Sequence, residues 1–139
     1  MSIDLPISKI QHIGIPVKNI SISSTFYKKL GFETVMDSDF EIPEGKGRCV
    51  MMQLKEIMLE LYQLPAELIE LDILNRKDGH IDHFAFDVKG IDQVYETISK
   101  AGFVIVQDGP VFLPFWKNGC TFFHIIGPDG ERIEFNEIL

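Results

Sequence analysis

The sequence predicts an α+β fold of two tandem β-α-β-β-β modules, with helices on the outer face of a curved mixed sheet. The first observation behind this prediction is an internal repeat, because landmarks in the first half of the chain recur 71 positions later without a gap. These landmarks are His12 with His83, Val17 with Val88, Ile20 with Ile91, and Gly31-Phe32 with Gly102-Phe103. We therefore expect one domain at 1–139, with a first module at about 7–64, a linker at 65–79 and a second module at about 80–139.

The second observation is that each module opens with a strand pattern followed by a helix pattern. Ile10–Val17 and Ile81–Val88 alternate with period two, which is typical of a strand with one apolar face. In the second module the next apolar residues recur at i, i+3, i+4 and i+7, as Ile91, Val94, Tyr95 and Ile98. Asn19 suits the N-cap of the first helix, and Gly31 and Gly102 stand where a left-handed residue would end each helix.

The remainder of each module reads as a pair of strands. These pairs are Arg48–Leu54 with Ile57–Tyr62 in the first module and Cys120–Ile126 with Glu131–Glu137 in the second. Gly127-Pro128-Asp129-Gly130 between the latter two suits a type I turn. The acidic segment Asp37–Gly47, which contains Pro and Gly, predicts a mobile loop. In the linker, Ala66–Leu74 can form a short helix.

The composition of the 139 residues narrows the possible partners and compartment. Asp plus Glu number 21 against 13 Lys plus Arg, and the net charge of −8 argues against nucleic acid or an anionic membrane as a partner. Met1–Ile10 has no signal-peptide pattern, and no apolar run is long enough to span a membrane. We therefore expect a cytoplasmic protein in which Cys49 and Cys120 are buried, unpaired strand residues.

Four residues of metal-ligand type occupy matched places in the two modules. His12 and His83 belong to the opening strands, while Glu60 and Glu134 belong to the last strands, each on the face opposite its apolar neighbours. All four should then point to the concave side of the sheet, and a local two-fold axis would bring them to one centre. Two buried carboxylates are costly together unless a cation lies between them. A mixed set of N and O ligands predicts one divalent transition metal per site, namely Zn, Ni, Co, Mn or Fe.

Five motifs spread over nearly the whole chain point to a known family. They are His12-Ile-Gly-Ile-Pro-Val17, Phe26-Tyr-Lys-Lys-Leu-Gly-Phe32, Leu59-Glu-Leu61, His83-Phe-Ala-Phe-Asp-Val88 and Gly127-Pro-Asp-Gly-Glu-Arg-Ile-Glu134. With these motifs the sequence resembles the vicinal oxygen chelate superfamily of glyoxalases, bleomycin-resistance proteins and extradiol dioxygenases. The resemblance implies paired β-α-β-β-β modules, a metal in the cavity that they form, and a homodimer.

Within that superfamily, the ligand set resembles that of glyoxalase I. The pattern His-Glu-His-Glu matches His12, Glu60, His83 and Glu134 residue by residue. This implies a lyase or isomerase that converts a thiol–2-oxoaldehyde hemithioacetal to a 2-hydroxyacyl thioester through an enediolate. Glu134 is the first choice for the base that moves the proton, and Glu60 is its symmetric partner.

Two alternatives stay open. Methylmalonyl-CoA epimerase resembles this pattern but has Gln in place of Glu60, and it uses the same enolate chemistry. The other alternative is a non-catalytic protein of the same fold that sequesters a small aromatic compound, as resistance proteins do. The residues also leave open whether the two modules pair within one chain or across a dimer.

The residues that would bind a small-molecule substrate are less well defined. Arg48, Lys117 and Asn118 are the candidates for holding substrate carboxylates. Pro110–Trp116 is apolar, and its Phe112, Phe115 and Trp116 would contact an aromatic or acyl group, or else pack at a dimer interface. His124 is expected in the core or the pocket wall, and His80 on the opposite strand face is excluded from the site.

Overall fold

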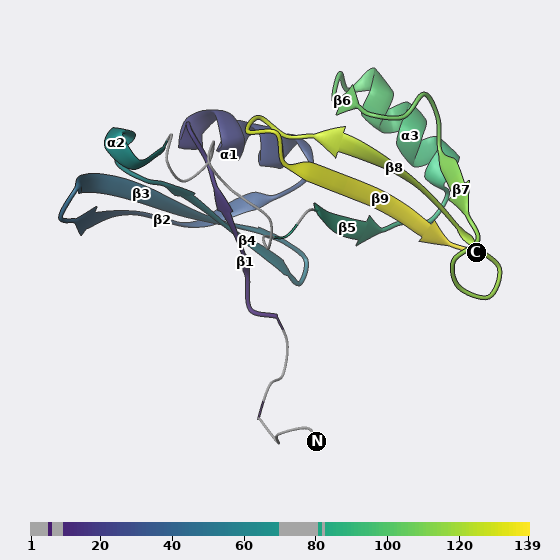
Figure 1. Ribbon diagram of the computed structural model, residues 1–139, viewed down its shortest axis with the longest axis horizontal. Coiled ribbons are helices and arrows are strands. Elements are labelled where there is room, and N and C mark those ends of the chain that lie inside the picture. Colours follow the sequence, from purple (N-terminus) through teal and green to yellow (C-terminus); the bar gives the residue numbers. More distant parts are fainter. Residues whose placement is uncertain (1–5, 7–9, 70–80, 82) are drawn as a thin grey trace. The chain divides into compact units, whose positions relative to one another are not determined.

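The computed structural model describes residue 6, residues 10–69, residue 81 and residues 83–139, in two compact units, Met1–Asn75 and Arg76–Leu139. The elements of the first unit are β1 (Ile13–Pro16), α1 (Ile20–Lys29), β2 (Glu33–Ile42), β3 (Gly45–Leu54), β4 (Ile57–Gln63) and α2 (Ala66–Ile69). Those of the second are β5 (His83–Asp87), α3 (Ile91–Lys100), β6 (Val104–Ile105), β7 (Val111–Leu113), β8 (Cys120–Ile126) and β9 (Arg132–Ile138). Each unit has the predicted α+β composition (Figure 1).

The first unit is a four-stranded sheet in the order β1-β4-β3-β2. β1 pairs with β4 in parallel, and the other pairs are antiparallel, so the sheet is mixed as predicted. α1 lies against β3 and β4 (Figure 1). The period-two pattern places Ile15, Val17, Leu59 and Leu61 in the buried core together with Tyr27 of α1.

The second unit repeats this topology with one change at the edge of its sheet. Its order is β5-β9-β8-β6, again with a parallel first pair, and β7 also pairs with β8. β6 and β7 thus share the side of β8 that corresponds to the side of β3 bordered by the single strand β2. α3 covers β8 and β9 (Figure 1), and the buried core contains Ile98, Phe123, Ile125, Ile133 and Phe135.

The predicted helix ends are confirmed. The side chain of Asn19 accepts the backbone N–H groups of Ser21 and Ile22, which satisfies two donors of the first turn of α1. Gly31 and Gly102 follow the two helices with φ of +99° and +80°, a conformation that glycine adopts without steric cost.

The predicted turns between paired strands are also confirmed. Leu54 pairs with Ile57 across Lys55-Glu56, so these two residues form the turn of the β3–β4 hairpin. The N–H of Gly130 donates to the carbonyl of Gly127 at 3.1 Å, the bond that closes a four-residue turn before β9.

The prediction of a mobile loop at Asp37–Gly47 is wrong. This segment forms most of β2 and the start of β3, which pair from Glu33 with Gln53 to Ile42 with Gly45. β2 is an edge strand and is exposed along most of its length, so it lacks the apolar alternation that marks a half-buried strand. β3 pairs with β2 along its whole length, the Pro of the segment lies in the turn between the two strands, and the acidic side chains of β2 are typical of a protected edge.

The linker prediction is only partly covered by the described residues. α2 spans Ala66–Ile69 at the start of the segment predicted to be helical, while residues 70–74 and His80 lie outside the described part of the chain. No helix in the described ranges is long and apolar enough to cross a membrane. Cys49 in β3 is half-buried, Cys120 in β8 is buried, and both are free thiols.

Candidate metal centre

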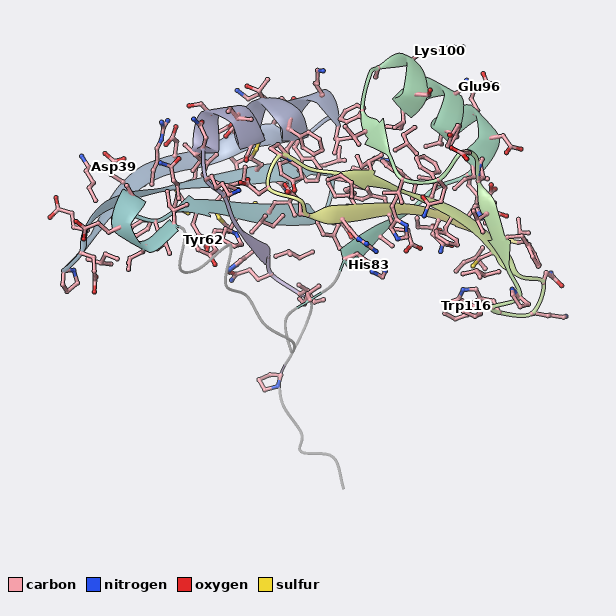
Figure 2. All side chains as sticks on the ribbon, turned by 45° about the horizontal axis from the view of Figure 1, so that its top comes forward. Asp39, Tyr62, His83, Glu96, Lys100 and Trp116 are labelled. Atoms are coloured by element: carbon pink, nitrogen blue, oxygen red, sulfur yellow. The ribbon has the colours of Figure 1, made fainter. Side chains whose placement is uncertain are left out.

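The pairing of β8, β9 and β5 places three polar side chains together in the second unit. Glu134 in β9 lies directly opposite His124 in β8, and on its other side it pairs with Ala85 of β5. Because residues two apart in a strand share a face, His83 lies on the same side of β5 as Ala85, diagonally from Glu134. The sticks of Figure 2 show His83 projecting from this strand.

The Glu134 carboxylate is the centre of this cluster. Glu134 as a whole residue is only 8% exposed, although its side chain is ionisable. Its Oε2 lies 3.1 Å from Nε2 of His83 and 3.1 Å from Nε2 of His124, and its Oε1 accepts Nδ2 of Asn136 at 2.6 Å. These contacts replace the water that the carboxylate loses on burial.

The donor chemistry of His83, His124 and Glu134 fits a divalent cation. One ligand-type atom from each of the three lies within 4.8 Å of the others. Imidazole nitrogen with carboxylate oxygen suits Zn, Ni, Co, Mn or Fe(II) better than Ca or Mg. A cation between them would also offset the buried negative charge of Glu134.

The first unit contains the matching His–Glu pair. Gly14 of β1 pairs with Glu60 of β4, and His12 precedes Gly14 by two residues, just as His83 precedes Ala85. Nε2 of His12 lies 3.6 Å from Oε2 of Glu60, and Nδ1 lies 3.1 Å from the Gln11 side-chain oxygen. About a third of each side chain of the pair is exposed, at 35% for His12 and 32% for Glu60.

The two carboxylates differ in the residue that faces them across the sheet. The strand partner of Glu60 is Met51, whereas the partner of Glu134 is His124. A thioether offers no N–H donor, so the cross-strand neighbour supports the carboxylate only in the second unit. The two units thus share the order of their first three sheet strands but differ in the chemistry around the carboxylate.

The predicted ligands are brought together pairwise within each unit, His12 with Glu60 and His83 with Glu134. That both pairs serve one metal stays a prediction. His124, which the sequence assigned to the core or pocket wall, contacts Glu134 itself.

The remaining residues that the sequence predicts to bind substrate belong partly to the first unit and partly to the second. Arg48 forms a two-bond ion pair with Asp37 on the β2–β3 hairpin, at 2.8 and 2.6 Å, which raises the pKa of Arg48 and lowers that of Asp37. The other candidates are exposed residues of the second unit, Phe112, Phe115, Trp116, Lys117 and Asn118. Trp116, at 69% exposure, lies in the loop between β7 and β8 (Figure 2). Their role toward a substrate stays a prediction.

Sequence reasoning missed two polar residues that complete the second cluster. Asn136 could have been found, because it follows Glu134 by two residues in a strand and therefore shares its face. Gln107, whose side chain contacts His124 twice, gives no such indication, since its position depends on a bend after β6.

Comparisons with known proteins agree with this architecture. The family model of the glyoxalase/bleomycin resistance protein/dioxygenase superfamily matches residues 9–135. The chain belongs to this superfamily.

Similar proteins extend over nearly the full length of the chain. The uncharacterized protein YwbC of Bacillus subtilis (strain 168) is 27% identical over 148 residues, covering 91% of this chain and 95% of YwbC. The solved structure of a glyoxalase family protein from Enterococcus faecalis superposes with a TM-score of 0.73 at 24% identity, covering 96% of this chain and 100% of that one. A glyoxalase family protein from Bacillus cereus gives a TM-score of 0.66 at 18% identity, covering 99% and 98%. At these identities the structural likenesses show a shared fold.

Proposed function

We propose that this chain is a metal-dependent lyase or isomerase of the glyoxalase I type. Its substrate would be the hemithioacetal of a thiol and a 2-oxoaldehyde, and its product the isomeric 2-hydroxyacyl thioester. The observation that carries the proposal is the repeated pairing of a histidine Nε2 with a glutamate carboxylate, His12 with Glu60 and His83 with Glu134. This donor set suits a transition metal with positions left for substrate oxygens.

The residues that would hold the metal are these two His–Glu pairs. When bound, a divalent transition metal supplies Lewis-acid polarisation of two neighbouring substrate oxygens. One metal for both pairs would give one equivalent per chain, whereas separate metals would give two. Two equivalents of metal per chain in the purified protein would therefore contradict the four-ligand prediction.

The isomerisation itself moves one hydrogen between neighbouring carbons. The carbon that bears sulfur and hydroxyl loses a proton, and the adjacent carbonyl carbon gains one. The hydroxyl proton passes at the same time to the former carbonyl oxygen, so atoms and charge balance and no oxidant or reductant is needed. A positioned carboxylate that accepts this proton and returns it meets the requirement for general acid–base catalysis.

Glu134 is the better placed of the two carboxylates for this step. Both of its oxygens are held, one by Asn136 and the other by His124, and the residue is buried. A proton-transfer group works best when its orientation is fixed before the substrate arrives. Glu60 is more exposed and faces Met51, so we assign it the role of a ligand that is less tightly oriented.

The deciding experiment combines metal analysis with turnover. The protein is expected to contain a divalent transition metal, to convert methylglyoxal in the presence of thiols, and to lose this activity on chelation until metal is added back. A metal-free protein that binds aromatic compounds with an affinity indifferent to chelators would instead be a sequestering protein. Deuterium wash-in at the α-carbon of a methylmalonyl thioester, without turnover of methylglyoxal, would identify an epimerase.

A further inference from the structure

Two contacts between Gln107 and His124 determine which ring nitrogen of His124 carries the proton. The backbone N–H of His124 donates to Oε1 of Gln107 at 2.7 Å, and Nε2 of Gln107 lies 2.9 Å from Nδ1 of His124. A backbone amide can only donate, so the carbonyl oxygen of the Gln107 side chain must face it. The NH2 group then faces Nδ1, and because this group is also only a donor, Nδ1 must be the acceptor.

The lone pair on Nδ1 fixes the state of the other ring nitrogen of His124. A neutral imidazole with a lone pair on Nδ1 carries its proton on Nε2. Nε2 of His124 lies 3.1 Å from Oε2 of Glu134, so it donates a hydrogen bond to that carboxylate. A metal-ligating histidine has the opposite polarity, because it offers the lone pair of one nitrogen to the metal and donates the other N–H to an oxygen.

We propose that Gln107 locks His124 as a hydrogen-bond donor to Glu134, and that His124 is therefore a positioning residue of the metal centre and not one of its ligands. The tautomer of His124 is inferred from its contacts with Gln107 alone. The positioning role of His124 also depends on the proposed function of Glu134. Of the three residues in the cluster, His83 and Glu134 are then the metal ligands. His124 donates a hydrogen bond to the Glu134 carboxylate.

The unusual edge of the second sheet explains how Gln107 reaches this place. β6 ends at Ile105, and the N–H of the next residue, Val106, still donates to the carbonyl of His124 at 2.9 Å. A regular antiparallel pair would return a main-chain carbonyl to the N–H of His124, but here the Gln107 side chain takes that bond. Tyr95 of α3 stabilises this bend, because its hydroxyl donates a hydrogen bond to the backbone carbonyl of Gln107 at 2.9 Å.

The first unit shows that this relay is specific to the second. In the first unit Met36 pairs with Met51, and Met51 in turn pairs with Glu60. The row Gln107–His124–Glu134 is thus matched by Met36–Met51–Glu60. Two thioethers take the place of the amide and the imidazole, so the support of the carboxylate differs between the units.

His12 provides an internal contrast with His124. Its Nδ1 lies 3.1 Å from Oε1 of the exposed Gln11, and in this orientation of the amide Nδ1 donates and leaves the Nε2 lone pair on the side of Glu60. That is the polarity of a ligating histidine. In this orientation Gln11 favours the tautomer of His12 opposite to the one that Gln107 imposes on His124.

The tautomer can be measured without metal or substrate. Long-range proton–nitrogen NMR correlation of ¹⁵N-histidine-labelled, metal-free protein distinguishes the two neutral tautomers, with the His124 signals assigned by their loss in His124→Gln. We expect the Nε2–H form for His124 and a protonated Nδ1 in Gln107→Glu, because the introduced carboxylate accepts from both the backbone amide and Nδ1. Gln93→Glu, on the exposed side of α3, adds the same charge elsewhere and should change nothing. An Nδ1–H tautomer in the unaltered protein would overturn the proposal.

The metal arm uses cobalt(II), whose visible spectrum reports the number and type of ligands. His124→Gln, which keeps a donor toward Glu134, should retain the cobalt spectrum of the unaltered protein. His124→Leu should retain that spectrum while the affinity falls by about 10- to 100-fold, as expected for loss of a residue that orients a ligand. His83→Gln should lose cobalt or change the spectrum.

If either His124 variant changes the spectrum as His83→Gln does, His124 is a ligand and the proposal fails. Should the unaltered protein bind no cobalt, zinc or nickel, the proposed function fails, while the NMR measurement still decides the tautomer.

Discussion

The carboxylate of Glu137 accepts the backbone N–H of Ile91 at 2.8 Å, so the last strand of the second unit caps the helix that follows its first strand. Its other oxygen accepts the N–H of Gly90 at 3.0 Å. In the first unit the side-chain oxygen of Gln63 accepts the backbone N–H of Ile20 at 2.7 Å. Gln63 and Glu137 are 74 positions apart, the same spacing as Glu60 and Glu134. The strand that carries the site carboxylate therefore also fixes the start of the helix.

This cap gives a pH-dependent prediction. The hydrogen bonds from Ile91 and Gly90 hold the pKa of Glu137 below its ordinary value. A carboxyl with a depressed folded-state pKa stabilises the protein above its unfolded pKa, and this contribution is lost as the pH falls through the folded value. Glu137→Gln should lower the Tm by a few degrees at pH 7, and the difference from the unaltered protein should shrink in acid.

Glu96→Gln, which removes the same charge from an exposed pair with Lys100, should leave the Tm nearly unchanged. A constant difference at every pH would mean that the charge plays no part.

The fold was predictable where the determinants are local. Asn19, Gly31 and the Gly127–Gly130 turn act through bonds to residues a few positions away, and the structure has them as the sequence predicted. β2 was not predictable in this way, because its exposed edge has no apolar alternation and only pairing with β3 defines it.

The site shows the same division. The His–Glu pairs follow from the repeat together with strand alternation, so sequence reasoning reached them. The contact of His124 with Glu134 depends on the register of β8 against β9, and the orientation of its ring depends on a bend in the edge strand at Gln107. Both are tertiary properties that periodicity does not encode.

Asn136 should be important for the stability of the buried carboxylate. Its Nδ2 donates to Oε1 of Glu134 at 2.6 Å, a hydrogen bond to a charged group. Asn136→Ala leaves that oxygen without this donor, and we expect a loss of about 1.5–3 kcal/mol in the free energy of unfolding. Urea denaturation of the metal-free protein measures this, with Asn118→Ala in the exposed β7–β8 loop as the control. A loss as small as that of the control would contradict the assigned hydrogen bond.

The reactivity of Cys49 should report the charge of Glu60. Burial raises the pKa of the Cys49 thiol, and the negative charges of Glu60 and Asp37 raise it further. Less thiolate is then present at pH 8, so Cys49 should be alkylated more slowly than an exposed thiol. Glu60→Gln removes one of these charges and should accelerate alkylation of Cys49 by about two- to threefold. The rate is measured by mass spectrometry of the peptide that contains Cys49. Asp39→Asn, which removes a charge paired with Lys46, serves as the control; equal rates in both variants would refute the coupling.

Glu134 and Glu60 should respond differently to the same substitution. If Glu134 moves the proton, Glu134→Gln should slow substrate-dependent deuterium exchange by at least about 100-fold, the lower range for loss of a general base. Glu60→Gln should retain more of this exchange once enough metal is added to compensate for its weaker binding, because it removes a ligand without removing the base. Exchange is followed by NMR in deuterium oxide with methylglyoxal and a thiol, each variant being first shown to melt cooperatively. Glu56→Gln, in the β3–β4 turn, controls for loss of charge alone. Near-normal exchange in Glu134→Gln, together with its loss in metal-saturated Glu60→Gln, would transfer the catalytic role to the first unit.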